Sequence, residues 1–148
     1  MTNLTIKTIF TDFFNTAKDA MLSDSTLKSK FDGAIFDSEP GREGLELRPV
    51  PFMVISFPDD SPEVTVMDNT AQISDLSSEV RIVLPYEERS EIGVFAGLIK
   101  GAIRDNDDNF RRKGFMFVKI SYDGMSTEIH DKKMEAVGTF TIDCGGAY

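Results

Sequence analysis

The sequence has only one cysteine and one histidine, and it contains no long apolar run. A single cysteine excludes an internal disulfide framework, and one cysteine with one histidine excludes the common zinc clusters. No apolar run approaches the roughly 18 residues that predict a membrane-spanning helix. The opening residues, MTNLTIKTIF, have neither a basic start nor a continuous apolar stretch, so we expect no signal peptide. These absences favour a soluble protein of a reducing compartment.

Basic residues are scarce relative to acidic ones. The chain has 25 Asp and Glu against 16 Lys and Arg, which gives a net charge of −9. This balance argues against a protein that binds nucleic acid by neutralising phosphates, because such proteins present a basic surface. Residues 34–80 hold ten acids and two arginines, so the acidity lies in the middle third. We interpret this third as a solvated face; the alternative is a surface that repels an anion or complements a basic neighbour.

The composition is that of an ordinary globular domain. With 148 residues, 41% of them apolar and 28% charged, residues 1–148 are expected to form a single domain. Apolar side chains recur at spacings of three and four over residues 6–21, which predicts an amphipathic helix capped by Asn3 or Thr5. A short turn or second helical piece is expected over residues 26–31.

Strand patterns dominate the middle of the chain. Ile35 and Phe36 are expected to form a short strand, and residues 38–48 an exposed loop. The apolar run at 52–57, between two prolines, predicts a strand that is buried on both faces. Residues 64–66 are expected to pair back on that strand, residues 68–78 to form a polar loop, and residues 80–84 to form the next strand.

A second helix is predicted to begin near Ser90, whose hydroxyl would cap it. Its inward stripe is expected to consist of Ile92, Phe95, Ala96, Ile99 and Ile103. Gly93, Gly97 and Gly101 follow one another at four-residue spacing, and we expect them to let the helix pack closely on a sheet.

The chain is expected to end in two strands, over residues 115–122 and 136–144, joined by a polar connector over residues 123–135. In the last strand, one side is predicted to carry Gly138, Phe140, Ile142 and Cys144. The order of the elements predicts an α+β fold: a mostly antiparallel sheet with an N-terminal helix and a second helix packed on it.

No residue pattern predicts catalysis, cofactor binding or a metal site. His130 lies in the polar connector with no sign of a nucleophile near it. Cys144 is interpreted as a small buried side chain rather than a nucleophile. The oxygen-rich run at 105–109 resembles the start of a calcium loop, but Phe110 and Met116 stand where that loop needs Gly and Glu. We therefore predict that the protein is not an enzyme and has no cofactor.

A basic triplet, Arg111, Arg112 and Lys113, follows this run directly. Such a triplet could hold a phosphate or an acidic neighbour. We do not expect the triplet to bind nucleic acid and interpret it instead as a charge-balanced turn. An acidic protein partner stays open.

Element order and three strings carry a resemblance to a known family. The strings are PFMVISFP at 51–58, EVRIVLPYEE at 79–88 and AVGTFTIDC at 136–144. With the opening helix and the strand–helix unit over 79–103, residues 4–144 resemble the tail terminator, or tail-completion, proteins of long-tailed bacteriophages.

The resemblance implies a structural protein of the virion, assembled in the host cytoplasm. Members of this family form a hexameric ring that sits on the last ring of the tail tube protein, stops its polymerisation and faces the head-side connector or neck protein. DNA passes through the lumen without specific binding, and no membrane is involved. An acidic lumen would suit this role, because like charge repels the phosphate backbone. The candidate lumen residues, chosen by the density of acids, are Asp59, Asp60, Glu63 and Asp68.

A ring needs an interface that closes on itself. We expect the connector at 123–135 and one edge strand to make the ring or tube contacts, since unpaired strand edges are natural docking surfaces. Three alternatives stay open. The first is another phage neck or head–tail connector protein. The second is a small cellular α+β ligand-binding module, which would need a concave pocket with converging polar groups. The third is an enzyme with carboxylate chemistry, which would need a raised pKa in a cleft.

Overall fold

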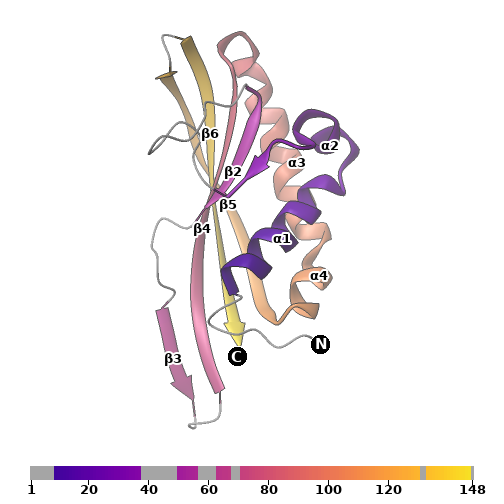
Figure 1. The fold of residues 1–148 in the computed structure, drawn as a ribbon, viewed down its shortest axis with the longest axis vertical. Coiled ribbons are helices and arrows are strands. Elements are labelled where there is room, and N and C mark those ends of the chain that lie inside the picture. The colour runs from indigo at the N-terminus through magenta and orange to yellow at the C-terminus, as the bar shows by residue number, and fades with distance from the viewer. Residues whose placement is uncertain (1–8, 38–49, 57–62, 68–70, 131–132, 148) are drawn as a thin grey trace.

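The computed structural model describes residues 9–37, 50–56, 63–67, 71–130 and 133–147. Helices cover one face of a six-stranded sheet (Figure 1). The helices are α1 (Ile9–Leu22), α2 (Ser25–Phe31), the 3-10 helix η1 (Tyr86–Glu91), α3 (Ile92–Asp105) and α4 (Asp107–Arg112). The strands are β1 (Ile35–Phe36), β2 (Phe52–Ser56), β3 (Glu63–Met67), β4 (Ala71–Pro85), β5 (Phe115–His130) and β6 (Lys133–Ala147).

The strand order is β1-β2-β4-β6-β5, and β3 pairs with β4 beyond the end of β2. Strands β1 and β2 run parallel, whereas every other described pair is antiparallel. Helix α1 and helix α3 both pack on this sheet and on each other. The predicted α+β fold, with a mostly antiparallel sheet and two packed helices, is therefore confirmed.

The main core lies between the helices and the sheet. Every residue of the predicted stripe on α3 is buried, from Ile92 to Ile103. On α1, Phe13 is fully buried and its ring meets those of Phe110 and Phe115 at centroid distances of 5.8 and 5.6 Å. Aromatic side chains from α1, α4 and β5 thus close the lower end of the core.

Alternation along β6 separates the two faces of the sheet. Phe140, Ile142 and Cys144 are buried in the main core, as the sequence predicts for that side of the strand. Val137, on the other side, belongs to a smaller apolar cluster with Phe52, Val54 and Val83 on the face away from the helices. Strand β2 contributes to both clusters, so the prediction that it is buried on both faces is confirmed.

Two predictions for residues 63–80 are wrong. Strand β3 pairs with residues 71–75 of β4, which follow it in the chain, and not back on β2. Residues 71–78 form the first half of β4 rather than a loop, because β6 pairs with this strand from residue 73 onward on its other side. Hydrogen bonding to neighbours on both sides makes a polar segment a strand, and such pairing cannot be read from composition.

The predicted connector is also a strand. Residues 123–130 continue β5 and pair with the first half of β6, so the two strands form a long hairpin. Ser90 does not cap α3: it lies within η1, and the N-cap residue is Glu91, which makes no side-chain capping hydrogen bond.

The glycines on α3 do not face the sheet, so the prediction of close packing through them is wrong. A Cβ atom on Gly93 or Gly97 would meet nothing within 4 Å. The close approach is made instead by Gly138 of β6, where a Cβ atom would lie 2.9 Å from Cγ2 of Ile92. Residues 1–8 and 38–49, with the predicted cap and loop, lie outside the described residues.

Candidate functional site

The residues considered for chemistry lie apart from one another. Cys144 is 1% exposed on β6. The backbone of His130 stands opposite Lys133 of β6, and the histidine side chain lies outside the described residues. Residues 105–109 end α3 and begin α4 rather than forming a loop. Among the described residues, no group of three or more His, Cys, Asp or Glu could hold a metal ion. No helix of the described chain is long and apolar enough to cross a membrane.

Exposed apolar side chains gather on the hairpin of β5 and β6. Five large apolar residues are exposed in the described part of the chain, and four of them belong to this hairpin. Ile129 is 73% exposed, Met125 51% and Met134 48%, while Tyr122 is less exposed and packs on Phe140. A group of this kind on one hairpin is a candidate contact surface.

The strand register places these side chains on one face. Met125 stands opposite Gly138, and Ile129 opposite Met134. Residues directly opposite each other share a face, and Gly138 faces Ile92 of α3. Because alternate residues along a strand also share a face, Met125, Ile129 and Met134 extend the helix-facing side of the sheet to a part that the helices leave exposed. We call these three residues, with Tyr122, the hairpin apolar face.

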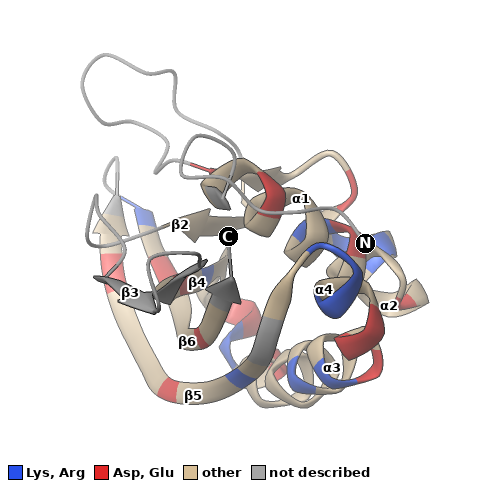
Figure 2. Cartoon of the chain, turned by 90° about the horizontal axis from the view of Figure 1, so that it is seen from below, with Lys and Arg blue, Asp and Glu red and all other residues tan. Residues whose placement is uncertain are grey.

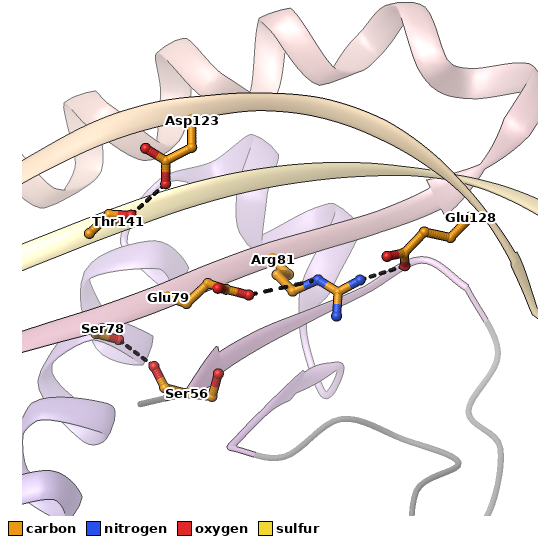
Figure 3. Close-up of polar contacts among 7 residues, drawn as sticks. All are labelled: Ser56, Ser78, Glu79, Arg81, Asp123, Glu128 and Thr141. Atoms are coloured by element: carbon orange, nitrogen blue, oxygen red, sulfur yellow. Dashed lines mark hydrogen bonds and ion pairs between the residues drawn. The ribbon is translucent and has the colours of Figure 1, made fainter. Parts of the chain in front are cut away.

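Polar contacts lie on the opposite face of the hairpin, and one of them links it to β4 (Figure 3). The Arg81 guanidinium of β4 reaches across β6 and pairs with the Glu128 carboxylate of β5. Its Nε also lies 4.0 Å from Glu79 Oε1. The Thr141 hydroxyl donates a hydrogen bond to the Asp123 carboxylate. These contacts add to the backbone pairing of β4 with β6, which extends to Pro85 and Glu135 and fixes the position of the hairpin.

A bulge in β5 sits where the hairpin leaves the core. The register shifts between Tyr122 and Gly124, and Gly124 adopts a φ of 128°, a conformation that favours glycine. A bulge bends a strand and increases its twist. This one lies at the start of the exposed part of the hairpin.

A groove of about 490 Å³ lies between α3, α4 and the first half of β5. Its lining combines apolar side chains with a charged rim: Ile103, Val118, Ile120, Lys100, Arg104, Asp107 and Arg111. The volume falls within the range of about 300–1,000 Å³ that is usual for ligand pockets. Its charged rim is open to solvent, however, since the Arg104 side chain is 80% exposed and that of Arg111 64%.

The rim of the groove is positively charged. Three cations, on α3 and α4, face one carboxylate, and Figure 2 shows the basic segments on both helices. Arg111 Nε lies 2.9 Å from Asp107 Oδ2, and Arg104 Nε lies 3.5 Å from Asp105 Oδ1. Exposed ion pairs of this type contribute only about 0–1 kcal/mol, so both arginines can exchange these partners for an incoming anionic group at little cost.

A second charged cluster joins α2 to η1 at the other end of α3. The Lys30 ammonium donates a hydrogen bond to the Glu88 carboxylate, and Glu91 Oε2 lies 3.9 Å from Lys30 Nζ. The hydrogen bond from Lys30 is the main reason that the pKa of Glu88 lies below its ordinary value of 4.5. The cluster fastens η1 to the helix layer, which is a structural role.

Sequence reasoning located part of these surfaces. The connector at 123–135, expected to make contacts, contains most of the hairpin apolar face. The groove was missed because Arg111 was interpreted as part of a turn. Lys100 and Arg104, four residues apart on one helix, were the signal that could have revealed a basic face. The candidate lumen residues Asp59, Asp60 and Asp68 lie outside the described residues, as does the side chain of Glu63.

No known protein-family model matches the chain, and no curated protein matches its sequence.

Proposed function

We propose that the chain is a structural virion protein, a tail terminator that forms a ring, caps the tail tube and joins it to the head-side connector. In this proposal the protein has no catalytic role. The hairpin apolar face is the observation that carries it. The resemblance of residues 4–144 to tail terminators adds the identity of the assembly.

The exposed hairpin favours self-association for two physical reasons. Fully burying an aliphatic side chain the size of Ile or Met contributes roughly 1.5–3 kcal/mol, so three such residues can support an interface. Strand β5 is also paired only with β6 among the described strands, which leaves the other edge of its backbone open for pairing with a neighbour. Ile129, the most exposed of the three, has little part in the fold of one copy.

The charge of the chain agrees with a lumen that DNA crosses. A net charge of −9 per copy, repeated around a ring, would repel the phosphate backbone and prevent DNA from adhering. The proposed partners are further copies of the chain, the tail tube protein and the head-side connector or neck protein.

Particle mass in solution, combined with negative-stain imaging, tests the proposal. We expect a ring with a mass near six times the 16.5 kDa of one chain. The measured mass should rise with the protein concentration, as it does for a self-associating protein. A monomer at every concentration would exclude the ring, and a monomer that binds a small anion would favour the ligand-binding module.

Removal of the hairpin tip tests the surface itself. Deletion of residues 125–133 should leave a folded monomer, because this segment lies beyond the main core, and should abolish the ring. Ile129→Asp should have the same effect on assembly without shortening the strands, whereas Thr127→Ser, on the same face, serves as the matched control. Light scattering measures the mass, and circular dichroism checks the fold. An intact ring in the deletion variant would show that the hairpin is not the contact.

A pull-down distinguishes a tail terminator from another neck protein. Tail terminators and neck connectors differ in which ring they contact. We expect the assembled ring to retain tail tube protein. Retention of portal-side protein alone would assign the chain to the neck instead.

A further inference from the structure

We propose that the groove between α3, α4 and β5 binds an extended acidic segment of a partner protein, which adds to the sheet as a further strand beside β5. The site is complete in one copy of the chain, so it goes beyond the proposed ring and does not depend on it. Two independent features support it: the outer backbone edge of β5 and the positively charged rim of the groove.

The first half of β5 has a backbone edge to which another strand can pair. Strand β5 ends the strand order β1-β2-β4-β6-β5, so no described strand lies on its outer side. Its register against β6 is regular from Phe117 to Tyr122, and a shift of register borders this stretch at each end. The N–H and C=O groups along such an edge are a template for an incoming strand. The bulge after Tyr122 separates this stretch from Met125 and Ile129 of the hairpin apolar face.

The groove lies beside this edge. Helix α3 contacts α1 as well as β5 and β6, so α3 is the helix nearest the outer margin of the sheet. Val118 and Ile120 belong to the regular stretch, line the groove and are partly exposed. They stand opposite Cys144 and Ile142 of the main core, so their side chains point to the helix side of the sheet. A strand added to β5 would place every second side chain on this side, where α3 and α4 lie (Figure 2).

The rim of the groove favours acidic side chains at these positions. It carries Lys100, Arg104 and Arg111 against one carboxylate, that of Asp107. The cations are spread along the groove: Lys100 and Arg104 are about 6 Å apart along α3, and Arg111 is on α4. Alternate residues of an extended segment are about 6.6 Å apart, so successive groove-facing positions come within reach of different cations. The segment that fits has acidic residues at alternate positions and an apolar residue among them, over Val118 and Ile120.

A peptide segment fits this site better than a small anion does. The side chains of Arg104 and Arg111 are 80% and 64% exposed, so water and salt weaken their attraction for an isolated anion. An extended peptide adds hydrogen bonds to the backbone of β5, which supply affinity that the exposed charges do not. The charges then determine which peptide binds.

A synthetic peptide, acetyl-Thr-Glu-Thr-Leu-Thr-Glu-Thr-amide, tests the inference, because its Glu and Leu side chains share one face of a strand. Fluorescence anisotropy of a labelled form measures its dissociation constant for the unaltered protein and for Ile129→Asp. The latter removes the hairpin contact and leaves the groove lining unchanged. The same peptide with lysine at both glutamate positions should bind about tenfold more weakly or worse. A peptide of the original composition with its two glutamates on opposite faces is the matched control and should also bind more weakly.

Charge reversal on the rim tests the groove. Lys100→Glu with Arg104→Glu should weaken binding of the acidic peptide by roughly fivefold to fiftyfold, because two attractive contacts become repulsive. Arg112→Glu with Lys113→Glu makes the same change of charge outside the groove lining and should bind within about twofold of the unaltered protein. Thermal melting followed by circular dichroism checks that both variants are folded.

Backbone pairing is tested with N-methylated peptides. Alternate residues of a strand direct their N–H groups to the same edge, so methylation of the Thr nitrogens blocks one edge, and methylation of the Glu and Leu nitrogens blocks the other. One of the two peptides should bind like the unmodified one, and the other about tenfold more weakly or worse. Amide exchange in residues 117–122 should slow when the unmodified peptide is bound.

The results that would overturn the inference are distinct from those that concern the ring. Equal binding of the acidic and lysine peptides, or unchanged affinity in the groove variant, would show that the rim does not select the partner. Equal binding of the two N-methylated peptides would show that no strand is added. Absence of binding to both the unaltered protein and Ile129→Asp would exclude the site. A monomer that binds the acidic peptide would refute the ring and leave this inference standing.

Discussion

Substituting Gly138 by alanine tests how closely helix α3 lies on the sheet. This glycine is in the middle of β6, directly beneath the start of α3. A Cβ atom there would lie 2.9 Å from Cγ2 of Ile92 and 3.1 Å from Cγ1 of Ile82. Both atoms are bonded directly to the Cβ of a branched side chain, so neither can move aside without a change of rotamer or a shift of the backbone.

The expected loss of stability follows from two opposing effects. Forcing an extra methyl group into a packed core costs about 1–3 kcal/mol. Replacing glycine within a strand by alanine recovers about 0.5–1 kcal/mol, because the unfolded chain loses conformational freedom. Gly138→Ala should therefore lower the free energy of unfolding by roughly 0.5–2 kcal/mol. The midpoint of urea-induced unfolding at pH 7 measures this change.

Gly97→Ala provides a matched control with the opposite sign. Nothing lies within 4 Å of a Cβ atom at Gly97, on the exposed side of α3. The same substitution should therefore raise the free energy of unfolding, by up to about 1 kcal/mol, through helix propensity alone.

A double-mutant cycle assigns the cost at position 138 to the contact with Ile92. Ile92→Ala removes Cγ2 and should itself lower the stability by about 2–5 kcal/mol. The double variant should be less destabilised than the sum of the two single variants, since the added methyl group then has space. Additive effects, or a Gly138→Ala variant as stable as the unaltered protein, would refute the close approach of α3.

Two further predictions concern the charged contacts. Arg81→Ala should lower the free energy of unfolding by up to about 1 kcal/mol, because water can replace the lost partner of the half-exposed Glu128, and should speed amide exchange in residues 125–129. Lys30→Met should lower it by less than about 1 kcal/mol, since both partners are partly exposed. Because Lys30 lowers the pKa of Glu88, its contribution is complete above pH 4.5 and is lost as the pH falls through the lower folded-state pKa, so denaturation curves of the two proteins should converge there.

Elements in which apolar residues recur at the regular spacing of a helix or strand face were predictable from the sequence. The α3 stripe has the spacing of one helix face, and every residue in it is buried. The alternation in β6 places Phe140 and Ile142 on the core side, as predicted. In both elements the burial pattern is local, because it depends only on the residues of that element and on the geometry of a helix or strand.

The segments predicted wrongly are strands that form by pairing with residues far away in the sequence. Residues 71–78 and 123–130 are rich in polar residues and resemble loops in composition. They are strands because their backbones pair with β3 and β6, or with the first half of β6. A segment that is exposed on one or both faces carries little periodic signal, so the sequence alone cannot show that it is paired.

The glycine pattern on α3 likewise could not be interpreted from the sequence alone. Three glycines spaced four apart indicate that one line of the helix is smooth, but not which way it faces. The buried stripe of larger side chains decides the orientation, because burying it contributes more free energy than close backbone contact does. The glycine that does permit close approach, Gly138, is on the strand.

The end of the hairpin, which the sequence predicts as a connector, also carries the apolar face that supports the functional proposal. The wrong prediction and the exposed face have one physical cause. Side chains that hold a fold together are buried by it, and so they carry a periodic signal. Met125, Ile129 and Met134 are about half exposed or more, and their strands are held in place by backbone pairing with each other and with β4. Three large apolar side chains that the fold of one copy does not bury are costly to keep in water. Contact with a second molecule would remove that cost, and this is the reason that the hairpin apolar face supports the proposed self-association.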